Sequence, residues 1–323
     1  MWDRTMWVEI CDEGVLKMSS PISTEDLSYR KYISVLDTNM AYVDVGNGDP
    51  IVFLHGVPTP SYLWRNIIPR AIHLGRCLAP DFVGMGYSPA APNGSYRLRD
   101  HQRYLDAWLD VVGVKDNVVL VVHDWGSALG FNWAQRHADR IKALIYMESI
   151  VRPFYSWNDW PDNTKAFFQA QRSPAGEEMI LENNLFVEYI LPLRGVPEDA
   201  IDVYRSYWRI PGPSRMPMLA WTRELPIEGE PKDVVEVVES YARWLSTSPI
   251  PKLFIDADPA GFLIKGQREF CRAWPNQQVV TVNGAHFLME DSPNDVGNAI
   301  ARFVQKVLAG QIGREQPAKK KAA

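Results

Sequence analysis

One stretch of the sequence, residues 118–131, constrains the fold more than any other. It opens with five apolar residues, 118–122, most of them β-branched, which is typical of a strand buried on both faces. His123 and Asp124 interrupt the apolar run, and the small residues after Trp125 permit a sharp turn into a helical pattern. A strand, a tight turn and a helix with one reactive side chain at the turn form a nucleophile elbow.

The reactive side chain at this elbow is Asp124, where serine is more usual. A carboxylate that attacks carbon leaves an ester, which water must then cleave, so the sequence predicts hydrolysis in two steps through a covalent intermediate. The alternative is that Asp124 only caps the helix that follows. The apolar strand before Asp124 and the small residues after it favour the elbow.

Strands and helices alternate around the elbow. Further strand-like runs occupy residues 29–36, 40–45, 51–54, 76–79, 141–147, 251–257 and 278–282, and helical patterns occupy 61–72, 98–112, 233–245, 265–273 and 293–308. This order predicts a mainly parallel, doubly wound α/β sheet with helices on both faces. Catalytic groups of such sheets gather at the carboxyl ends of the strands, where residues 56–57, Asp81, Asp124 and Glu148 fall.

Residues 152–226 are rich in aromatic side chains and proline and show no clear strand. Because strand-like runs resume after them, we expect a helical cap inserted into a core made of residues 29–151 and 227–310; an ordinary helical layer is the alternative. Residues 1–28 are expected to form an N-terminal extension, either packed on the surface or partly disordered. Residues 311–323 have the composition of a disordered tail.

The composition argues against several classes of protein. A net charge of −5, with a dense basic cluster only at residues 319–321, argues against nucleic-acid binding. No stretch approaches the ~18 apolar residues of a membrane span, and the charged N-terminus does not resemble a secretory signal. Three widely spaced cysteines (Cys11, Cys77 and Cys271) predict reduced thiols in a cytoplasmic protein, and neither a disulfide framework nor a metal site.

The predicted ester needs a base that activates water, and His286 is the candidate. It follows the last predicted strand, and the chain order nucleophile, acid, histidine is that of this kind of site. His55 precedes a glycine turn and is expected to be structural, while the side chain of His123 is expected to point to the opposite side of its strand from Asp124. The remaining histidines are placed in helical surface contexts: His73, His101 and His137.

An acid must orient His286, and Glu148 is the preferred candidate because it ends the strand next to the elbow. Asp256 and Asp258, around the end of the following strand, are its competitors.

Two further groups are expected to stabilise negative charge. The backbone N–H groups of Val57 and Trp125 are expected to form an oxyanion hole. The indole N–H of Trp125, a donor without acceptor function, suits a departing anion such as chloride or bromide; the alternative is that Trp125 only packs against the cap.

Four segments of the chain resemble the haloalkane dehalogenases: residues 55–69, 122–131, 270–276 and 284–293. The resemblance extends from about residue 29 to about residue 310. It is strongest for the subfamily whose acid follows the strand after the elbow, which supports Glu148. Residues 93–98 and 181–184 are also similar to the coelenterazine luciferase of sea pansies, which shares the fold and much of the catalytic set.

The resemblance implies an α/β-hydrolase fold and hydrolytic dehalogenation of small halogenated aliphatic compounds to alcohol and halide, without a cofactor or metal. Asp124 would displace halide from carbon in an SN2 step, Trp125 would hold the halide, and His286 with Glu148 would activate water. We expect no nucleic-acid or membrane partner, and a monomer or weak homo-oligomer. The expected substrate pocket is lined by Phe168, Phe186, Trp221 and Phe287.

The chain departs from the family pattern at Val57. The subfamily normally has asparagine there, whose side-chain amide is the second halide donor, whereas a valine side chain cannot donate. Another subfamily uses a cap tryptophan in its place, and the candidates here are Trp157, Trp160, Trp208 and Trp221. The cap around residues 194–213 also differs from the family.

Three other functions fit parts of the pattern. An epoxide hydrolase shares the aspartate nucleophile and needs no halide site, but it needs cap tyrosines, for which the candidates are Tyr189, Tyr204 and Tyr207. A luciferase-like oxygenase and a ligand-binding protein that kept the scaffold without activity are the other two. The complete set of nucleophile, acid and histidine favours an enzyme.

Overall fold

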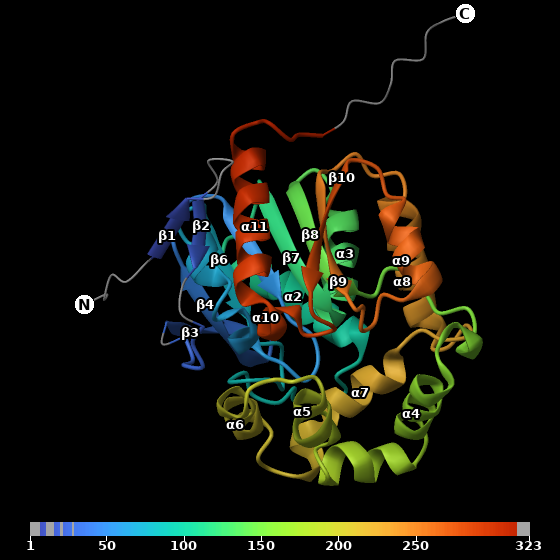
Figure 1. Ribbon diagram of the computed structural model, residues 1–323. Coiled ribbons are helices and arrows are strands. Elements are labelled where there is room, and N and C mark those ends of the chain that lie inside the picture. The colour runs from blue at the N-terminus through green and yellow to red at the C-terminus, as the bar shows by residue number, and fades with distance from the viewer. Residues whose placement is uncertain (1–6, 11–15, 20–21, 28, 315–323) are drawn as a thin grey trace, which may run out of the picture.

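The computed structural model describes residues 7–10, 16–19, 22–27 and 29–314. Its centre is an eight-stranded sheet with the order β10-β9-β8-β7-β5-β6-β4-β3 (Figure 1). Neighbouring strands from β10 to β6 are parallel, while β4 pairs antiparallel with both β6 and β3. These strands are β3 (Arg30–Val35), β4 (Thr38–Val45), β5 (Pro50–Leu54), β6 (Arg76–Pro80), β7 (Val118–Asp124), β8 (Ile141–Ser149), β9 (Lys252–Asp258) and β10 (Gln277–Asn283). The predicted mainly parallel sheet is confirmed.

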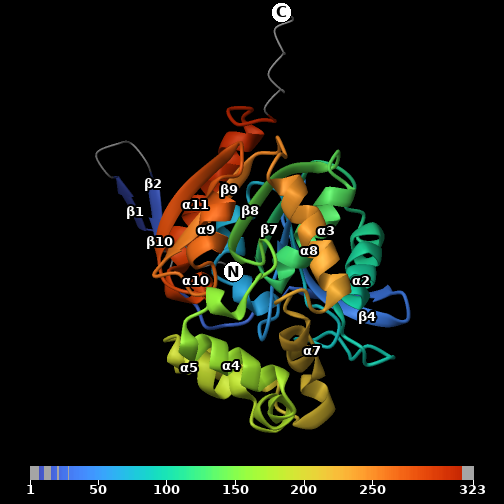
Figure 2. The same cartoon turned by 90° about the vertical axis from the view of Figure 1, so that its right-hand side faces the viewer.

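Helices cover both faces of the sheet (Figures 1 and 2). Helices α2, α3 and α8 pack on one face, and α1 and α11 pack together on the other. The helices outside residues 152–226 are α1 (Ile68–Ala71), α2 (Leu98–Val111), α3 (Trp125–Arg136), α8 (Lys232–Leu245), α9 (Lys265–Arg272), α10 (Leu288–Asp291) and α11 (Pro293–Leu308). None of the described helices is both long and apolar enough to cross a membrane.

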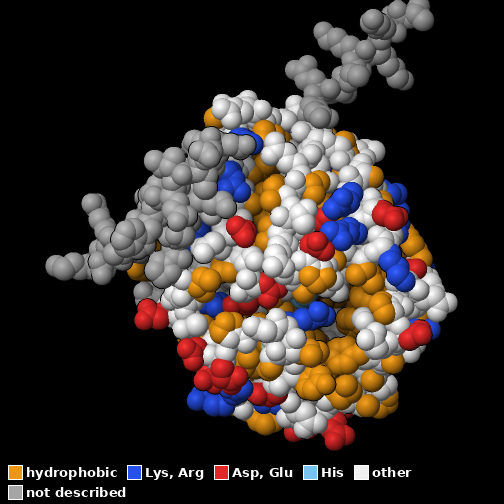
Figure 3. All heavy atoms as spheres, in the orientation of Figure 1, with side chains coloured by type: hydrophobic (Ala, Val, Ile, Leu, Met, Phe, Trp, Pro, Cys, Tyr) orange, Lys and Arg blue, Asp and Glu red, His pale blue; other side chains and the backbone are white. Residues whose placement is uncertain are grey.

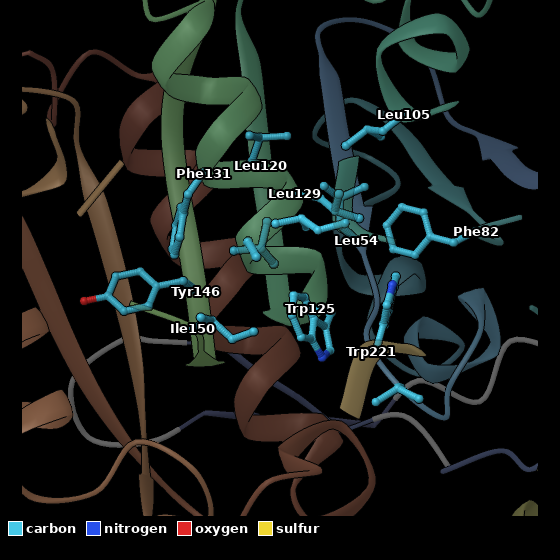
Figure 4. Packing of buried hydrophobic residues seen from close by; sticks show 14 of the residues in the cluster. Leu54, Phe82, Leu105, Leu120, Trp125, Leu129, Phe131, Tyr146, Ile150 and Trp221 are labelled. Atoms are coloured by element: carbon cyan, nitrogen blue, oxygen red, sulfur yellow. The ribbon is translucent and has the colours of Figure 1, made fainter. Parts of the chain in front are cut away.

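Strand β7 explains why the elbow begins with an unbroken apolar run. All its residues are buried, and successive side chains of a strand point to opposite faces. Val118, Leu120 and Val122 belong to the core under α2, α3 and α8, part of which Figure 4 shows. Val119 and Val121 belong to the core under α11. Because both faces are covered, no position of the strand needs a polar side chain until the sheet ends.

The helices of residues 152–226 lie at the carboxyl ends of the parallel strands, below the sheet in Figure 1. They are α4 (Asp162–Arg172), α5 (Leu191–Leu193), α6 (Glu198–Tyr207) and α7 (Met216–Glu224), with two π-helical segments, Glu177–Glu182 and Phe186–Ile190, and two 3-10 turns, Trp157–Asp159 and Gly212–Arg215. The division of the chain into a core and an inserted cap stays a prediction, and we call residues 152–226 the cap in that sense.

Part of the N-terminal extension is ordered against the rest of the molecule. Strands β1 (Trp7–Ile10) and β2 (Leu16–Ser19) form an antiparallel pair. The backbone of Ser23 exchanges hydrogen bonds with the side chain of Asn66, at 2.9 and 3.0 Å. Asp26 accepts hydrogen bonds from Arg30 and from the hydroxyl of Tyr207 in the cap. Residues 22–27 therefore connect the core with the cap, while residues 1–6, 11–15, 20–21 and 28 lie outside the described part.

The structure differs from the sequence prediction at residues 61–72, and it describes only part of the expected tail at residues 311–323. The helix expected over residues 61–72 is two short pieces, a 3-10 turn at Ser61–Trp64 and α1. Pro69 explains the break, because it has no N–H to continue a helical hydrogen-bond ladder. Of the expected tail, residues 311–314 are described, and Arg314 donates 2.9 Å to the carbonyl of Ile141; residues 315–323 lie outside the described part.

Candidate active site

Asp124 occupies the tip of the elbow between β7 and α3. Its backbone has φ 49° and ψ −128°, a strained conformation for a residue with a side chain. The turn is possible because Gly126 packs against β5: a Cβ at that position would lie 2.3 Å from the carbonyl oxygen of Leu54. Ser127 connects the turn to the residue after β8, since its Oγ accepts a 2.8 Å hydrogen bond from the N–H of Ile150. The fold thus presents the Asp124 carboxylate at the end of the sheet.

One oxygen of this carboxylate is already held by the backbone. The N–H of Val57 donates to Asp124 Oδ1 at 2.9 Å. Gly56 permits this approach, because a Cβ there would lie 2.1 Å from the same oxygen. His55 holds the turn, with Nδ1 2.8 Å from the Gly56 carbonyl and Nε2 accepting from the N–H of Phe82 at 3.1 Å. His55 is therefore structural, as expected, and fixes the N–H that faces Asp124.

The structure brings His286 and Glu148 to the same place. His286 Nε2 lies 3.5 Å from Asp124 Oδ2, and its Nδ1 lies 3.4 Å from Glu148 Oε2. Glu148 is buried and also accepts hydrogen bonds from the N–H groups of Gly261 and Phe262. These contacts fix the carboxylate against the imidazole.

The two competitors of Glu148 lie elsewhere. Asp256 is paired with Arg268 at 2.7 Å and with Arg272. Asp258 is exposed at the end of β9.

The charges at the site are coupled. Burial disfavours the charged form of His286, but hydrogen bonds to Asp124 and Glu148 and their negative charges raise its pKa from 6.5 to about 9. Burial also opposes ionisation of Asp124, yet the hydrogen bond and charge of His286 bring the pKa of that carboxyl below its usual value. At neutral pH the pair is therefore a carboxylate beside an imidazolium.

His123 takes part in this network, which its sequence position does not reveal. Its ring centroid lies 4.6 Å from that of His286. Its Nε2 donates 2.7 Å to the backbone carbonyl of His286, because a carbonyl can only accept. Burial lowers the pKa of His123 to about 3, so the ring is neutral. From the sequence we expected only that the His123 side chain points away from Asp124. Its contact with the loop that carries His286 was not predicted.

A cavity of about 340 Å³ opens beside these groups. Val57, Asp124, Trp125 and His286 line it at one end. All four predicted pocket residues also line it: Phe168, Phe186, Trp221 and Phe287. Glu148 is not part of the wall, since it lies behind His286. Tyr189, named from the sequence as a candidate cap tyrosine, also lines the cavity. Sequence reasoning missed a further set from the cap and from the loop after β9: Asn163, Thr164, Phe167, Ile190, Leu193, Arg194, Thr222, Leu225, Gly261 and Phe262.

The tryptophans near the Asp124 carboxylate differ in whether the indole N–H already donates a hydrogen bond. Trp125 and Trp221 lie side by side with ring centroids 5.6 Å apart (Figure 4). The N–H of Trp125 makes no hydrogen bond to a described residue, and Trp125 lines the cavity. Among the cap candidates, Trp160 and Trp221 line the cavity and have a buried indole N–H without a partner in the described part of the chain. Trp208 is already used, because its N–H donates to the Pro58 carbonyl at 2.8 Å.

His101 is not the surface residue that the sequence suggested. It is 1% exposed and packs against Tyr96, Phe82 and Trp221, with ring centroids 6.1, 5.9 and 4.7 Å away. Neither ring nitrogen has a partner among the described residues, and burial lowers its pKa to about 3. The helical spacing Leu98, His101, Leu105, Trp108 places the histidine on the apolar stripe of α2, and this signal could have revealed its burial.

No group of three or more His, Cys, Asp or Glu side chains is placed to hold a metal ion in the described ranges. Cys77 and Cys271 are buried free thiols; Cys11 lies outside the described residues.

The chain is similar in sequence to proteins of the α/β-hydrolase fold, several of them haloalkane dehalogenases. Residues 49–173 match the α/β-hydrolase fold family. The chain is 50% identical to a haloalkane dehalogenase of Sphingobium indicum, over 86% of this chain and 96% of the relative. It is 45% identical to a haloalkane dehalogenase of Mycolicibacterium smegmatis, over 87% and 92%. It is 39% identical to coelenterazine h 2-monooxygenase of Renilla reniformis, also over 87% and 92%.

Solved structures agree with these sequence matches. The crystal structure of a haloalkane dehalogenase from Bradyrhizobium elkani has a TM-score of 0.82 and 38% identity, covering 87% of this chain and 99% of that one. An ancestral haloalkane dehalogenase has a TM-score of 0.81 and 39% identity, covering 86% and 99%.

Proposed function

Because the chain belongs to the haloalkane dehalogenases, hydrolases of the α/β-hydrolase fold, we propose that it hydrolyses a carbon–halogen bond of small halogenated aliphatic compounds through an ester on Asp124. The observation that supports this most is the contact of Asp124 with both the Val57 N–H and His286 at one end of a largely apolar cavity. We propose a cytoplasmic location from the cysteine pattern.

The first step is nucleophilic displacement. Oδ1 of Asp124 is held by the Val57 N–H, so the proposed nucleophile toward the halogen-bearing carbon is the second oxygen, Oδ2, which lies 3.5 Å from His286 Nε2. An oxygen–carbon bond forms, the carbon–halogen bond breaks, and halide leaves with the electron pair. The unpartnered indole N–H of Trp125 is the proposed donor to that halide.

The second step is cleavage of the ester by water. The pKa of His286 is raised to about 9 by Asp124 and Glu148. In the free protein His286 is therefore protonated and cannot act as a base. Ester formation removes the negative charge of Asp124, so the pKa of His286 falls and the imidazolium releases its proton to the solvent. Neutral His286, oriented by Glu148, then takes a proton from water while the water oxygen forms a bond to the ester carbonyl carbon. Negative charge develops on Oδ1, where the N–H groups of Val57 and Trp125 stabilise it. The bond from the carbonyl carbon to the alkyl oxygen then breaks, the alcohol leaves with the proton that His286 took up, and the Asp124 carboxylate is restored.

The test is halide release from a panel of brominated and chlorinated alkanes. We expect bromide release by the native protein and none by Asp124→Ala. His286→Phe should still form the ester and then stop, which a mass increase on the peptide containing Asp124 would show. His73→Phe, at an exposed histidine outside the site, is the matched control and should turn over normally. Bromide release without any adduct on Asp124 in His286→Phe would rule out the two-step scheme.

A second prediction concerns the halide site, because the Val57 side chain cannot donate a hydrogen bond to the departing halide. A hydrogen bond to a charged group is worth about 1.5–3 kcal/mol, so Val57→Asn should raise the dehalogenation rate roughly ten- to a hundredfold where no other donor acts. Val57→Leu, which changes size without adding a donor, is the control.

A Val57→Asn variant with no gain would mean that a second donor is already present. We propose Trp160 or Trp221 for that role, since both have an unpartnered indole N–H. Inhibition by bromide, measured for Trp160→Phe and Trp221→Phe, separates them: the donor is the residue whose loss weakens inhibition.

Epoxide hydrolysis is less well supported by the placement of the cap tyrosines. The hydroxyl of Tyr204 donates to Glu290, and that of Tyr207 donates to Asp26. Of the three candidates only Tyr189 lines the cavity. An epoxide panel run beside the haloalkanes tests this alternative through diol formation.

A further inference from the structure

The solvent end of the cavity carries one basic side chain, Arg194. It directly follows α5, where its backbone N–H donates to the carbonyls of Ile190 and Leu191 and ends the helix. Its neighbours Tyr189 and Leu193 also line the cavity and are 61% and 68% exposed, so this segment forms the rim. Hydrophobic side chains gather over the lower right of the face in Figure 3, where α4 and α5 lie in Figure 1.

Arg194 differs from most other cap arginines in having no partner for its guanidinium among the described residues. Arg172 and Arg215 donate to backbone carbonyls. Arg205 is paired with Glu188, and Arg223 with Glu177. These four side chains serve the structure of the cap, whereas Arg194 is exposed and free to bind a ligand.

Arg194 interacts with the charge of Asp291, but the salt bridges between described residues include none for Arg194. Burial raises the pKa of Asp291, and the charge of Arg194 opposes that rise only in part, with no ion pair between the two described residues. At the inner end of the cavity, His286 faces the carboxylates of both Asp124 and Glu148. Arg194 is the one Lys or Arg of the lining, within the described part of the chain. The rim therefore carries positive charge beside an apolar interior.

We propose that the cavity accepts haloalkyl compounds whose far end carries an anionic group, such as a carboxylate, and that Arg194 binds this group at the rim. A substrate with its halogen against Trp125 and Asp124 directs its other end toward the solvent, where Arg194 lies. The alkyl chain contacts the apolar wall, and the guanidinium forms charge-assisted hydrogen bonds with the carboxylate. This inference rests on the proposed function, since the same Asp124 chemistry releases the halide.

The experiment compares ω-bromoalkanoates with 1-bromoalkanes of matched chain length. For the native protein, kcat/KM for the anionic series should exceed that of Arg194→Gln by roughly three- to tenfold, the range expected for a partly exposed charged contact. The neutral series should be almost unchanged in this variant. Arg194→Lys should restore part of the preference, and added salt should weaken it in the native protein. Arg209→Gln is the control, because it removes the same charge from an exposed cap residue that does not line the cavity.

The outcomes separate the two proposals. If neither series releases bromide, the proposed function fails. If the neutral series is turned over but the anionic one is not, or if Arg194→Gln and Arg209→Gln behave alike, dehalogenation stands and the role of Arg194 is overturned.

Discussion

His123 lies one residue before Asp124, but its hydrogen bond acts on the other half of the site. Its Nε2 donates to the carbonyl of His286 and so fixes the loop that carries the proposed base. The ring stays neutral because burial lowers its pKa to about 3. A neutral imidazole that donates at Nε2 leaves Nδ1 without a proton, and that atom has no partner among the described residues. We therefore assign His123 as a positioning residue for His286.

This assignment predicts different effects on the two chemical steps. His123→Phe keeps a ring but removes the donor, so ester cleavage should slow roughly ten- to a hundredfold, as expected when a base is displaced, while ester formation changes little. The alkylated protein should then accumulate in rapid-mixing and mass measurements. His123→Gln retains an N–H donor and should recover part of the rate. Equal slowing of both steps in His123→Phe would show that the residue supports the fold alone.

At the scale of elements, a buried ion pair joins three parts of the chain near the site. Arg65, after the 3-10 turn that follows β5, contacts both carboxylate oxygens of Glu290 on α10 at 2.6 and 2.7 Å. Tyr204 on α6 of the cap donates to the same carboxylate at 2.5 Å. Since α10 begins two residues after His286, this cluster connects the cap with the element that follows the proposed base.

The cluster predicts graded losses of stability. Arg65→Met leaves the Glu290 carboxylate buried without its counter-charge and should lower the free energy of unfolding by about 3–5 kcal/mol. Tyr204→Phe removes one hydrogen bond to a charged group and should cost about 1.5–3 kcal/mol. Urea denaturation measures both. If Tyr204→Phe proved as damaging as Arg65→Met, packing of the cap would outweigh the ion pair.

At the scale of the whole molecule, three buried histidines and the partly buried His286 contribute to the pH dependence of stability. The pKa values of His55, His101 and His123 are lowered by burial to about 4, 3 and 3. Below pH 6.5 these three histidines bind protons in the unfolded chain but stay neutral in the folded state. The free energy of unfolding therefore falls as the pH falls. The pKa of His286 is raised to about 9, so its contribution is complete below pH 6.5 and is lost as the pH rises to about 9. Because three of these pKa values are lowered and one is raised, the stability contributed by these four groups is greatest at about pH 7.

His101→Phe tests the acid side of this profile. The ring lies in an apolar cluster without hydrogen-bond partners in the described part of the chain, so phenylalanine removes a buried polar group and one titrating site. We expect higher stability at pH 5 than for the native protein, by about 1–3 kcal/mol, with a smaller gain at pH 7.5. Urea denaturation at the two pH values provides the comparison, and His73→Phe is the exposed control. An equal gain at both values would mean that packing, and not protonation, is responsible.

The sequence by itself determined the parts of this protein that depend on local geometry. The apolar run before Asp124 and the small residues after it specify a buried strand and a sharp turn. The order of strands and helices specifies the parallel sheet whose carboxyl ends bring Asp124, Glu148 and His286 together. These features are readable because they follow from the periodicity and steric limits of neighbouring residues.

Only the tertiary structure decided which groups find partners. In the folded chain the Trp208 N–H donates to the Pro58 carbonyl, the Tyr204 hydroxyl donates to Glu290, and His123 donates to the backbone carbonyl of His286. It also left Arg194 unpaired at the rim of the cavity. These outcomes depend on the positions of atoms from segments far apart in the chain. The strength of a hydrogen bond or charge in a buried place is set by those distant neighbours, which residue spacing does not encode.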